Sequence, residues 1–93
     1  MDLDMEPRPI EVKALKNYLI YVKFKNNEEK IYDMKENFKY PFYQKLRDIE
    51  KFKNVRISGI NIEWESGEDI APENLYNDSI PISEFSEEEL EEE

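Results

Sequence analysis

Apolar and polar residues alternate along much of the first third of the chain, which is the pattern of half-buried β-strands. Residues 10–16, 18–25 and 30–34 each show this alternation. The stretch 18–25 is the richest in β-branched and aromatic residues, which favour strands. Short turns at residues 16–17 and 26–29 separate the three stretches. We therefore predict an antiparallel three-stranded meander in this part of the chain.

The middle of the chain, residues 35–55, loses the alternation and gains a helical spacing. Its apolar residues recur at intervals of four, three and three: Phe42, Leu46, Ile49 and Phe52. This spacing lines one face of a helix. Pro41 is suited to a first helical turn, and Asp48 is suited to an N-cap. We predict two short helices here. Asp33, at the end of the third strand, is predicted to cap a turn or helix.

Alternation resumes at residues 55–58 and 60–64, with Gly59 at the bend between them. This pattern predicts a second β-hairpin, and the residues expected to face inward are Val55, Ile57, Ile60, Ile62 and Trp64. Together with the first meander and the helical middle, the hairpin predicts an α+β domain of five strands.

The stretch after the second hairpin raises the question of a functional carboxylate at Asp69. Ser66 and Gly67 supply a turn, in which the glycine is free to take positive φ. Pro72 and Glu73 suit the first turn of a short C-terminal helical segment. A single carboxylate without a nearby histidine, cysteine or second positioned acid is a poor catalyst. We therefore interpret Asp69 as a turn or helix cap.

Composition narrows the possible chemistry. The chain has 93 residues with no cysteine, no histidine and two glycines. Thiol nucleophiles, histidine bases and zinc sites built from these residues are therefore excluded. A glycine-rich phosphate loop and a calcium-binding loop motif are also missing. We predict that the protein is not an enzyme and that it has no cofactor or metal.

Charge is distributed unevenly along the chain. All 13 lysines and arginines lie within residues 1–56, whereas residues 57–93 hold 13 acidic residues and no basic one. Seven of these acids lie in residues 83–93. Such dense like charge disfavours folding. We predict a flexible N-terminus (1–8), one domain (9–78) and an acidic, disordered tail (79–93). Phe85 and Leu90 would be its docking residues if the tail bound a surface.

Basic and aromatic side chains are interleaved on the predicted first meander. The expected partner face consists of Tyr21, Lys23, Lys25, Lys30 and Tyr32. Such a face can bind RNA, but the net charge of −10 argues against direct nucleic-acid binding. A protein partner, or the protein's own tail, is the expected occupant.

In order, these motifs resemble the small bacterial family known as domain of unknown function 2442. The resemblance runs from about Pro9 to Tyr76 through KNYLIYVKFKNNEEKIYDM, FYQKLRDIEKFKNVRI and INIEWESGEDIAPENLY. The first stretch ends at Asp33, and the second includes Asp48. The third is the most specific, and its family positions fall on Trp64, Gly67, Asp69, Ile70, Pro72, Leu75 and Tyr76. The chain departs from the family pattern at Asn27 and Glu65, where glycine and proline are common.

The resemblance implies a small α+β module with no known activity or ligand. Family members often stand beside another small protein, an arrangement similar to toxin–antitoxin pairs. The leading hypothesis is therefore a non-enzymatic interaction or regulatory module, one half of a two-gene pair. The alternatives are a homo-oligomeric unit, or an acidic nucleic-acid mimic that binds a basic enzyme. No apolar run is long enough to cross a membrane, and no export signal or disulfide framework is evident. The expected compartment is the cytoplasm.

Overall fold

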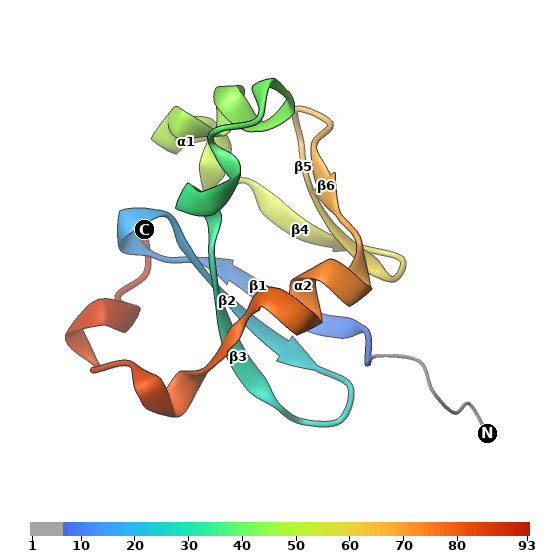
Figure 1. Cartoon of the computed structure of the whole chain (residues 1–93), viewed down its shortest axis with the longest axis vertical. Helices are drawn as coiled ribbons and strands as arrows, with labels where there is room; N and C mark the ends of the chain where they lie inside the picture. The colour runs from blue at the N-terminus through green and yellow to red at the C-terminus, as the bar shows by residue number, and fades with distance from the viewer. Residues whose placement is uncertain (1–6) are drawn as a thin grey trace.

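Two antiparallel β-sheets make up the framework of the protein (Figure 1). The computed structural model describes residues 7–93. The first sheet has the order β1-β2-β3-β7, with the strands β1 (Pro9–Ala14), β2 (Leu19–Phe24), β3 (Glu29–Asp33) and β7 (Ile80–Pro81). The second has the order β4-β5-β6, with the strands β4 (Val55–Ser58), β5 (Asn61–Trp64) and β6 (Asp69–Ile70). The predicted α+β class is confirmed. Strands β6 and β7 were not predicted, because two residues are too few to show alternation.

Residues with positive φ make the tight connections between strands. A 3₁₀ turn, η1 (Lys16–Tyr18), joins β1 to β2, and Asn17 in it has φ 63°. Asn27, between β2 and β3, has φ 74°. Asparagine is one of the few residues other than glycine that adopt this conformation readily. The two turns allow β1, β2 and β3 to pair in chain order.

The helical middle consists of three short segments: η2 (Met34–Asn37), η3 (Pro41–Arg47) and α1 (Ile49–Phe52). Pro41 begins η3, as predicted. Leu46 and Phe52 are buried, but Phe42 is 57% exposed, so the predicted apolar face is only partly formed. A 3₁₀ helix has three residues per turn, and side chains four positions apart therefore point about 120° apart rather than the roughly 40° of an α-helix.

The main core lies between the two sheets, the helical middle and α2 (Pro72–Asp78). Its buried residues are Ile20, Val22, Phe24, Tyr32, Met34, Leu46, Phe52, Ile62, Trp64, Ile70 and Leu75. Val55 and Ile57 pack against this core as predicted, whereas Ile60 in the β4–β5 turn is exposed. Ile10 is also exposed, because the register of β1 shifts between Pro9 and Glu11.

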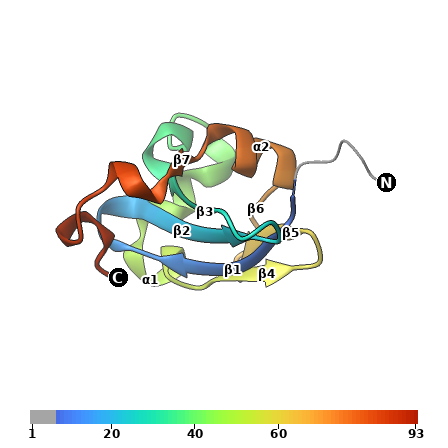
Figure 2. The same cartoon turned by 90° about the horizontal axis from the view of Figure 1, so that it is seen from below.

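The last part of the chain, residues 79–93, follows the surface of the first sheet, and we name it the strap. It contains β7 and two short 3₁₀ turns, η4 (Ile82–Glu84) and η5 (Glu88–Leu90). Figures 1 and 2 show the strap leaving α2 and ending beside the turn between β1 and β2. The structure thus differs from the predicted disordered tail. Ile82, Phe85 and Leu90 pack on apolar residues of the sheet, which offsets part of the repulsion between the acids.

Candidate functional site

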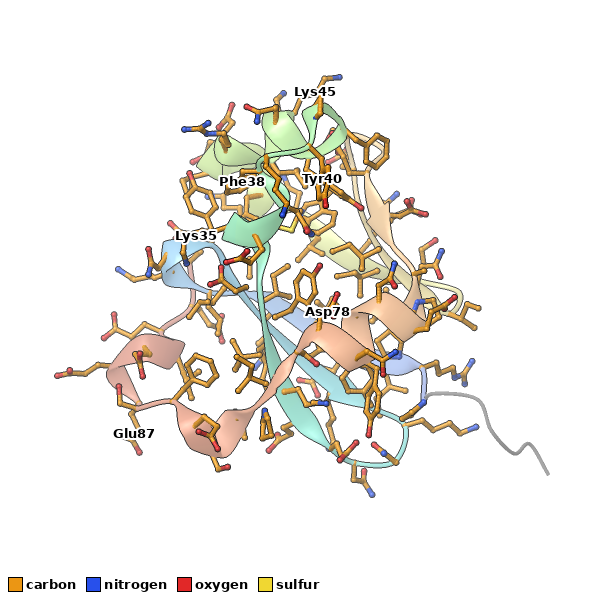
Figure 3. The ribbon with its side chains drawn as sticks, in the orientation of Figure 1. Lys35, Phe38, Tyr40, Lys45, Asp78 and Glu87 are labelled. Atoms are coloured by element: carbon orange, nitrogen blue, oxygen red, sulfur yellow. The ribbon has the colours of Figure 1, made fainter. Side chains whose placement is uncertain are left out.

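A groove opens between the helical middle and the segment formed by α2 and β7. Its volume is about 460 Å³, and it is lined by Tyr32, Asp33, Glu36, Asn37, Lys39, Tyr40, Asp78 and Ile80. We name it the Tyr32 groove. Figure 3 shows two of these residues, Tyr40 on the helical middle and Asp78 on α2, with the groove between their elements.

Tyr32 and Asn37 provide the polar floor of the groove. Tyr32 extends from β3 into the main core and is almost fully buried. Its hydroxyl oxygen accepts a hydrogen bond of 2.8 Å from the amide Nδ2 of Asn37. Burial raises the pKa of Tyr32 above its ordinary value of 10.0. The bond from Asn37 and the burial of the ring hold the phenol in place at the floor of the groove.

The rim of the Tyr32 groove combines exposed apolar surface with negative charge. Tyr40 is 50% exposed and Ile80 is 44% exposed, and both line the groove. The lining contains three carboxylates, those of Asp33, Glu36 and Asp78, and one ammonium group, that of Lys39. The Lys39 ammonium lies 5.4 Å from the centre of the Tyr40 ring. A partner with apolar and basic side chains would match this rim.

Two of the predicted carboxylate caps are present in the structure. The side chain of Asp33 accepts a hydrogen bond of 2.9 Å from the backbone N–H of Lys35 at the start of η2. Asp48 accepts one of 3.0 Å from the backbone N–H of Glu50 at the start of α1. Asp33 also lines the Tyr32 groove, so the cap fixes the chain at the groove's edge.

Asp69 does not cap α2, which corrects the interpretation made from the sequence. The N-cap of α2 is Ala71, without a side-chain hydrogen bond. Asp69 instead lies in β6 and pairs with Glu63 of β5. Its backbone carbonyl accepts a hydrogen bond of 2.8 Å from the Tyr43 hydroxyl. The short extended strand β6 occupies the two residues that would otherwise lead into the helix.

The other residues of the third motif have structural positions. Gly67 turns the chain after β5 with φ 108°, and Pro72 begins α2. The fully buried indole of Trp64 donates a hydrogen bond of 2.8 Å from Nε1 to the carbonyl of Phe52. Leu75 is also fully buried, and the Tyr76 ring packs edge-on against Phe24 with a centroid distance of 5.0 Å. These residues join the second sheet and α2 to the main core.

The predicted partner face is divided between the two sides of the first sheet. Tyr21 pairs with Ile31, so Lys30 and Tyr32 point to the opposite side from Tyr21. Tyr32 is part of the core. Lys30 donates to the backbone carbonyl of Tyr76 over 3.0 Å, and its ammonium lies 4.0 Å from the Tyr76 ring centre. The alternation within each strand was predicted, but the register between strands was not.

Tyr21 and Lys23 remain on the outward side of β2, and Lys25 is exposed just beyond its end. The Tyr21 hydroxyl donates a hydrogen bond of 2.6 Å to Glu29. Desolvation, followed by this bond, raises the pKa of Tyr21.

Sequence reasoning did not find the Tyr32 groove. Its residues come from β3, η2, the residues before η3, α2 and β7, so no local motif contains them. One available signal was Tyr40, because this aromatic residue lies outside the alternating and helical patterns.

Within residues 7–93, no group of three or more acidic side chains is arranged to hold a metal ion. Over the same residues, no helix is both long and apolar enough to span a membrane.

The fold and groove define a small α+β module with a mixed apolar and acidic depression on its surface. The chain belongs to the DUF2442 family, described as "Protein of unknown function", which it matches over residues 9–81. All the residues that line the Tyr32 groove lie within this range. No curated protein and no solved structure matches the chain.

Proposed function

We propose that the protein is a non-enzymatic interaction module that binds a protein partner through the Tyr32 groove. The observation that carries this proposal is the exposure of Tyr40 and Ile80 on the rim of the groove. Exposed aromatic side chains next to a pocket are typical anchors of protein interfaces.

The charge of the groove indicates the chemistry of the partner. With three carboxylates and one lysine in its lining, the groove favours a segment that carries lysine or arginine beside apolar side chains. Arginine suits this position well, because its guanidinium can bond a carboxylate in a bidentate manner and stack on a tyrosine ring.

Two further features support a binding role over catalysis. The chain has no histidine or cysteine, and burial raises the pKa of the Tyr32 phenol further above neutral pH. The groove therefore offers hydrogen-bond donors and acceptors, and its carboxylates have no histidine or cysteine beside them with which to form a catalytic pair. The partnership with the product of a neighbouring gene stays a prediction.

The edges of the sheets argue against the homo-oligomeric alternative. The outer strands β6 and β7 have two residues each, so they provide few backbone groups for pairing with another copy. The longer strand β1 is the other edge of the first sheet, and it lies against β4 of the second sheet.

A comparative pull-down tests the proposal. Tagged protein is incubated with nuclease-treated lysate of its native host, in parallel with the variants Tyr40→Ala and Phe42→Ala. Both variants remove one exposed aromatic ring, but only Tyr40 lines the groove. We expect one stoichiometric protein to be recovered with the unmodified chain and Phe42→Ala and to be lost with Tyr40→Ala.

Recovery of the same proteins with all three baits would contradict the assignment of the groove. If nothing is recovered, sedimentation equilibrium distinguishes a monomer from a self-associating unit, and self-association would replace the proposal. If a large basic nucleic-acid enzyme is recovered and is lost when residues 83–93 are deleted, the mimic hypothesis would replace it.

A further inference from the structure

The outward side of the first sheet has an apolar centre and a charged edge, at which the Lys13 ammonium lies 3.9 Å from the Glu11 carboxylate. The buried residues Leu15, Leu19 and Ile31 form a second small cluster, and Tyr21 packs beside them. We name these four residues the outer face. Lys13 and Lys16 lie at its edge, and the Lys13 ammonium is 5.6 Å from the centre of the Tyr21 ring. The outer face belongs entirely to the part of the chain that matches the family.

The strap covers the outer face with residues that follow the family match. Ile82, Phe85 and Leu90 provide the apolar contacts. The end of the strap also bonds to the chain around the β1–β2 turn. Lys16 donates its backbone N–H to the Glu91 carbonyl over 2.8 Å, and Glu93 donates to the Ala14 carbonyl over 3.0 Å.

Charge complementarity accompanies these contacts. The Lys13 ammonium lies 3.6 Å from the Glu92 carboxylate, and the Lys16 ammonium lies 3.9 Å from that of Glu91. All four side chains are substantially exposed, and ion pairs of this kind stabilise a contact only weakly. They favour an acidic segment on the outer face without fixing it tightly.

The strap does not fill the space above the outer face. A cavity of about 160 Å³ remains, lined by Lys13, Leu15, Tyr21, Ile82, Leu90 and Glu92. This space is open to solvent, so side chains that reach into it are not confined by packing on every side. A larger apolar side chain than that of Leu90 would fit there.

From these observations we propose that the outer face is a docking surface for an acidic protein segment with spaced apolar residues. The strap is the built-in occupant, and a partner segment of the same chemistry displaces it. Such a partner would bind more tightly than the strap if it placed an aromatic side chain where the strap places Leu90. The surface is separate from the Tyr32 groove, so this proposal stands or falls independently of the proposed function.

Displacement predicts a measurable competition. A free peptide binds only those molecules whose strap has left the outer face, so its apparent dissociation constant rises as the free fraction falls. If the strap is docked in roughly nine molecules of ten, weakening it should strengthen peptide binding about tenfold.

The experiment uses the full chain and a fluorescent synthetic peptide with the sequence of residues 79–93. Fluorescence anisotropy measures binding to the unmodified protein, to the strap variant Phe85→Ala with Leu90→Ala, and to the control Phe42→Ala. We expect the strap variant to bind about tenfold more tightly than the other two. A second peptide that carries Leu90→Phe should bind each protein more tightly than the first peptide does.

A second variant and a second measurement guard against loss of folding. Glu91→Lys with Glu92→Lys keeps the apolar strap residues and places like charges beside Lys13 and Lys16, so it should also strengthen peptide binding. In the unmodified protein, saturating peptide should shift the NMR amide signal of Glu93, because its bond to Ala14 is broken on displacement. The fluorescence of buried Trp64 reports that the body remains folded.

Equal affinity for all the protein variants would overturn the proposal. Equal binding of a scrambled peptide with the same net charge would also overturn the proposal, because it would show that the peptide binds through non-specific electrostatic attraction. An unshifted Glu93 signal at saturation would show that the peptide binds elsewhere.

Discussion

Replacing Trp64 with phenylalanine tests the packing of the main core. Trp64 is the single tryptophan of the chain. It is fully buried, stacks on Phe52 with a centroid distance of 6.4 Å and bonds the Phe52 carbonyl through Nε1. The indole thereby ties the second sheet to α1. The substitution removes this hydrogen bond and part of the ring while it keeps an aromatic side chain in the core.

The magnitude follows from two losses. Removing roughly 40 Å³ of buried side chain, at about 24 cal/mol per Å³ of unfilled cavity, costs about 1 kcal/mol. Depriving the Phe52 carbonyl of its buried donor costs about 1–3 kcal/mol more. We therefore expect Trp64→Phe to lower the free energy of unfolding by about 2–4 kcal/mol. A domain of this length has roughly 5–14 kcal/mol in total.

Urea unfolding followed by far-UV circular dichroism measures this change, because the variant has lost its tryptophan fluorescence. The transition midpoint should fall while the slope m stays the same. Phe42→Leu is the control, since Phe42 is exposed, and its effect should stay within about 0.5 kcal/mol. A loss below about 1 kcal/mol for Trp64→Phe would refute the reasoning, because it would mean that neither the bond nor the packing stabilises the fold as the structure indicates.

Three further predictions concern single residues. Burial raises the pKa of Tyr32 from its ordinary 10.0. The contribution of the neutral phenol to stability is therefore complete below about pH 10 and is lost as the pH rises through the folded-state pKa. Tyr32→Phe should reduce the loss of stability that thermal unfolding shows above pH 10. Gly67→Ala should lower the free energy of unfolding in urea by about 1–2 kcal/mol, because the backbone at Gly67 has φ 108°, although a Cβ there meets no atom within 4 Å. Gly59→Asn, at φ 62°, should be nearly neutral. Equal costs for the two substitutions would contradict the argument from φ. Asp48→Ala should cost about 1 kcal/mol through loss of an N-cap, whereas Asp69→Ala should cost less than about 0.5 kcal/mol; the reverse order would restore Asp69 as the cap.

The regular elements of the fold were predictable because their patterns are local. Alternation located β1 to β5, and asparagine and glycine marked four turns with positive φ, at Asn17, Asn27, Gly59 and Gly67. Asp33 and Asp48 were recognisable as caps because a cap depends on residues two positions away.

The surfaces were not predictable from local patterns. The Tyr32 groove is assembled from residues of five segments, and the division of the predicted partner face depends on the pairing of Tyr21 with Ile31. For the strap, the dense negative charge favoured a disordered tail, although Phe85 and Leu90 were recognised as possible docking residues. The packing of Ile82, Phe85 and Leu90 depends on a sheet face far away in sequence.

The two-residue strand β7 has a consequence for the order of folding. The bridge between Leu15 and Glu92 closes a loop of about 77 residues, and closing so long a loop in one step costs more chain entropy than closing a short one. Strand β7 holds Ile80 and Pro81 against β3. Once β7 has formed, the loop that the bridge at Glu92 closes contains only about ten residues. By the logarithmic dependence on loop length, this reduces the entropic cost by about 2 kcal/mol. We therefore expect the hairpins and β7 to form first, and the contact at residues 14–16 to form last and to open first.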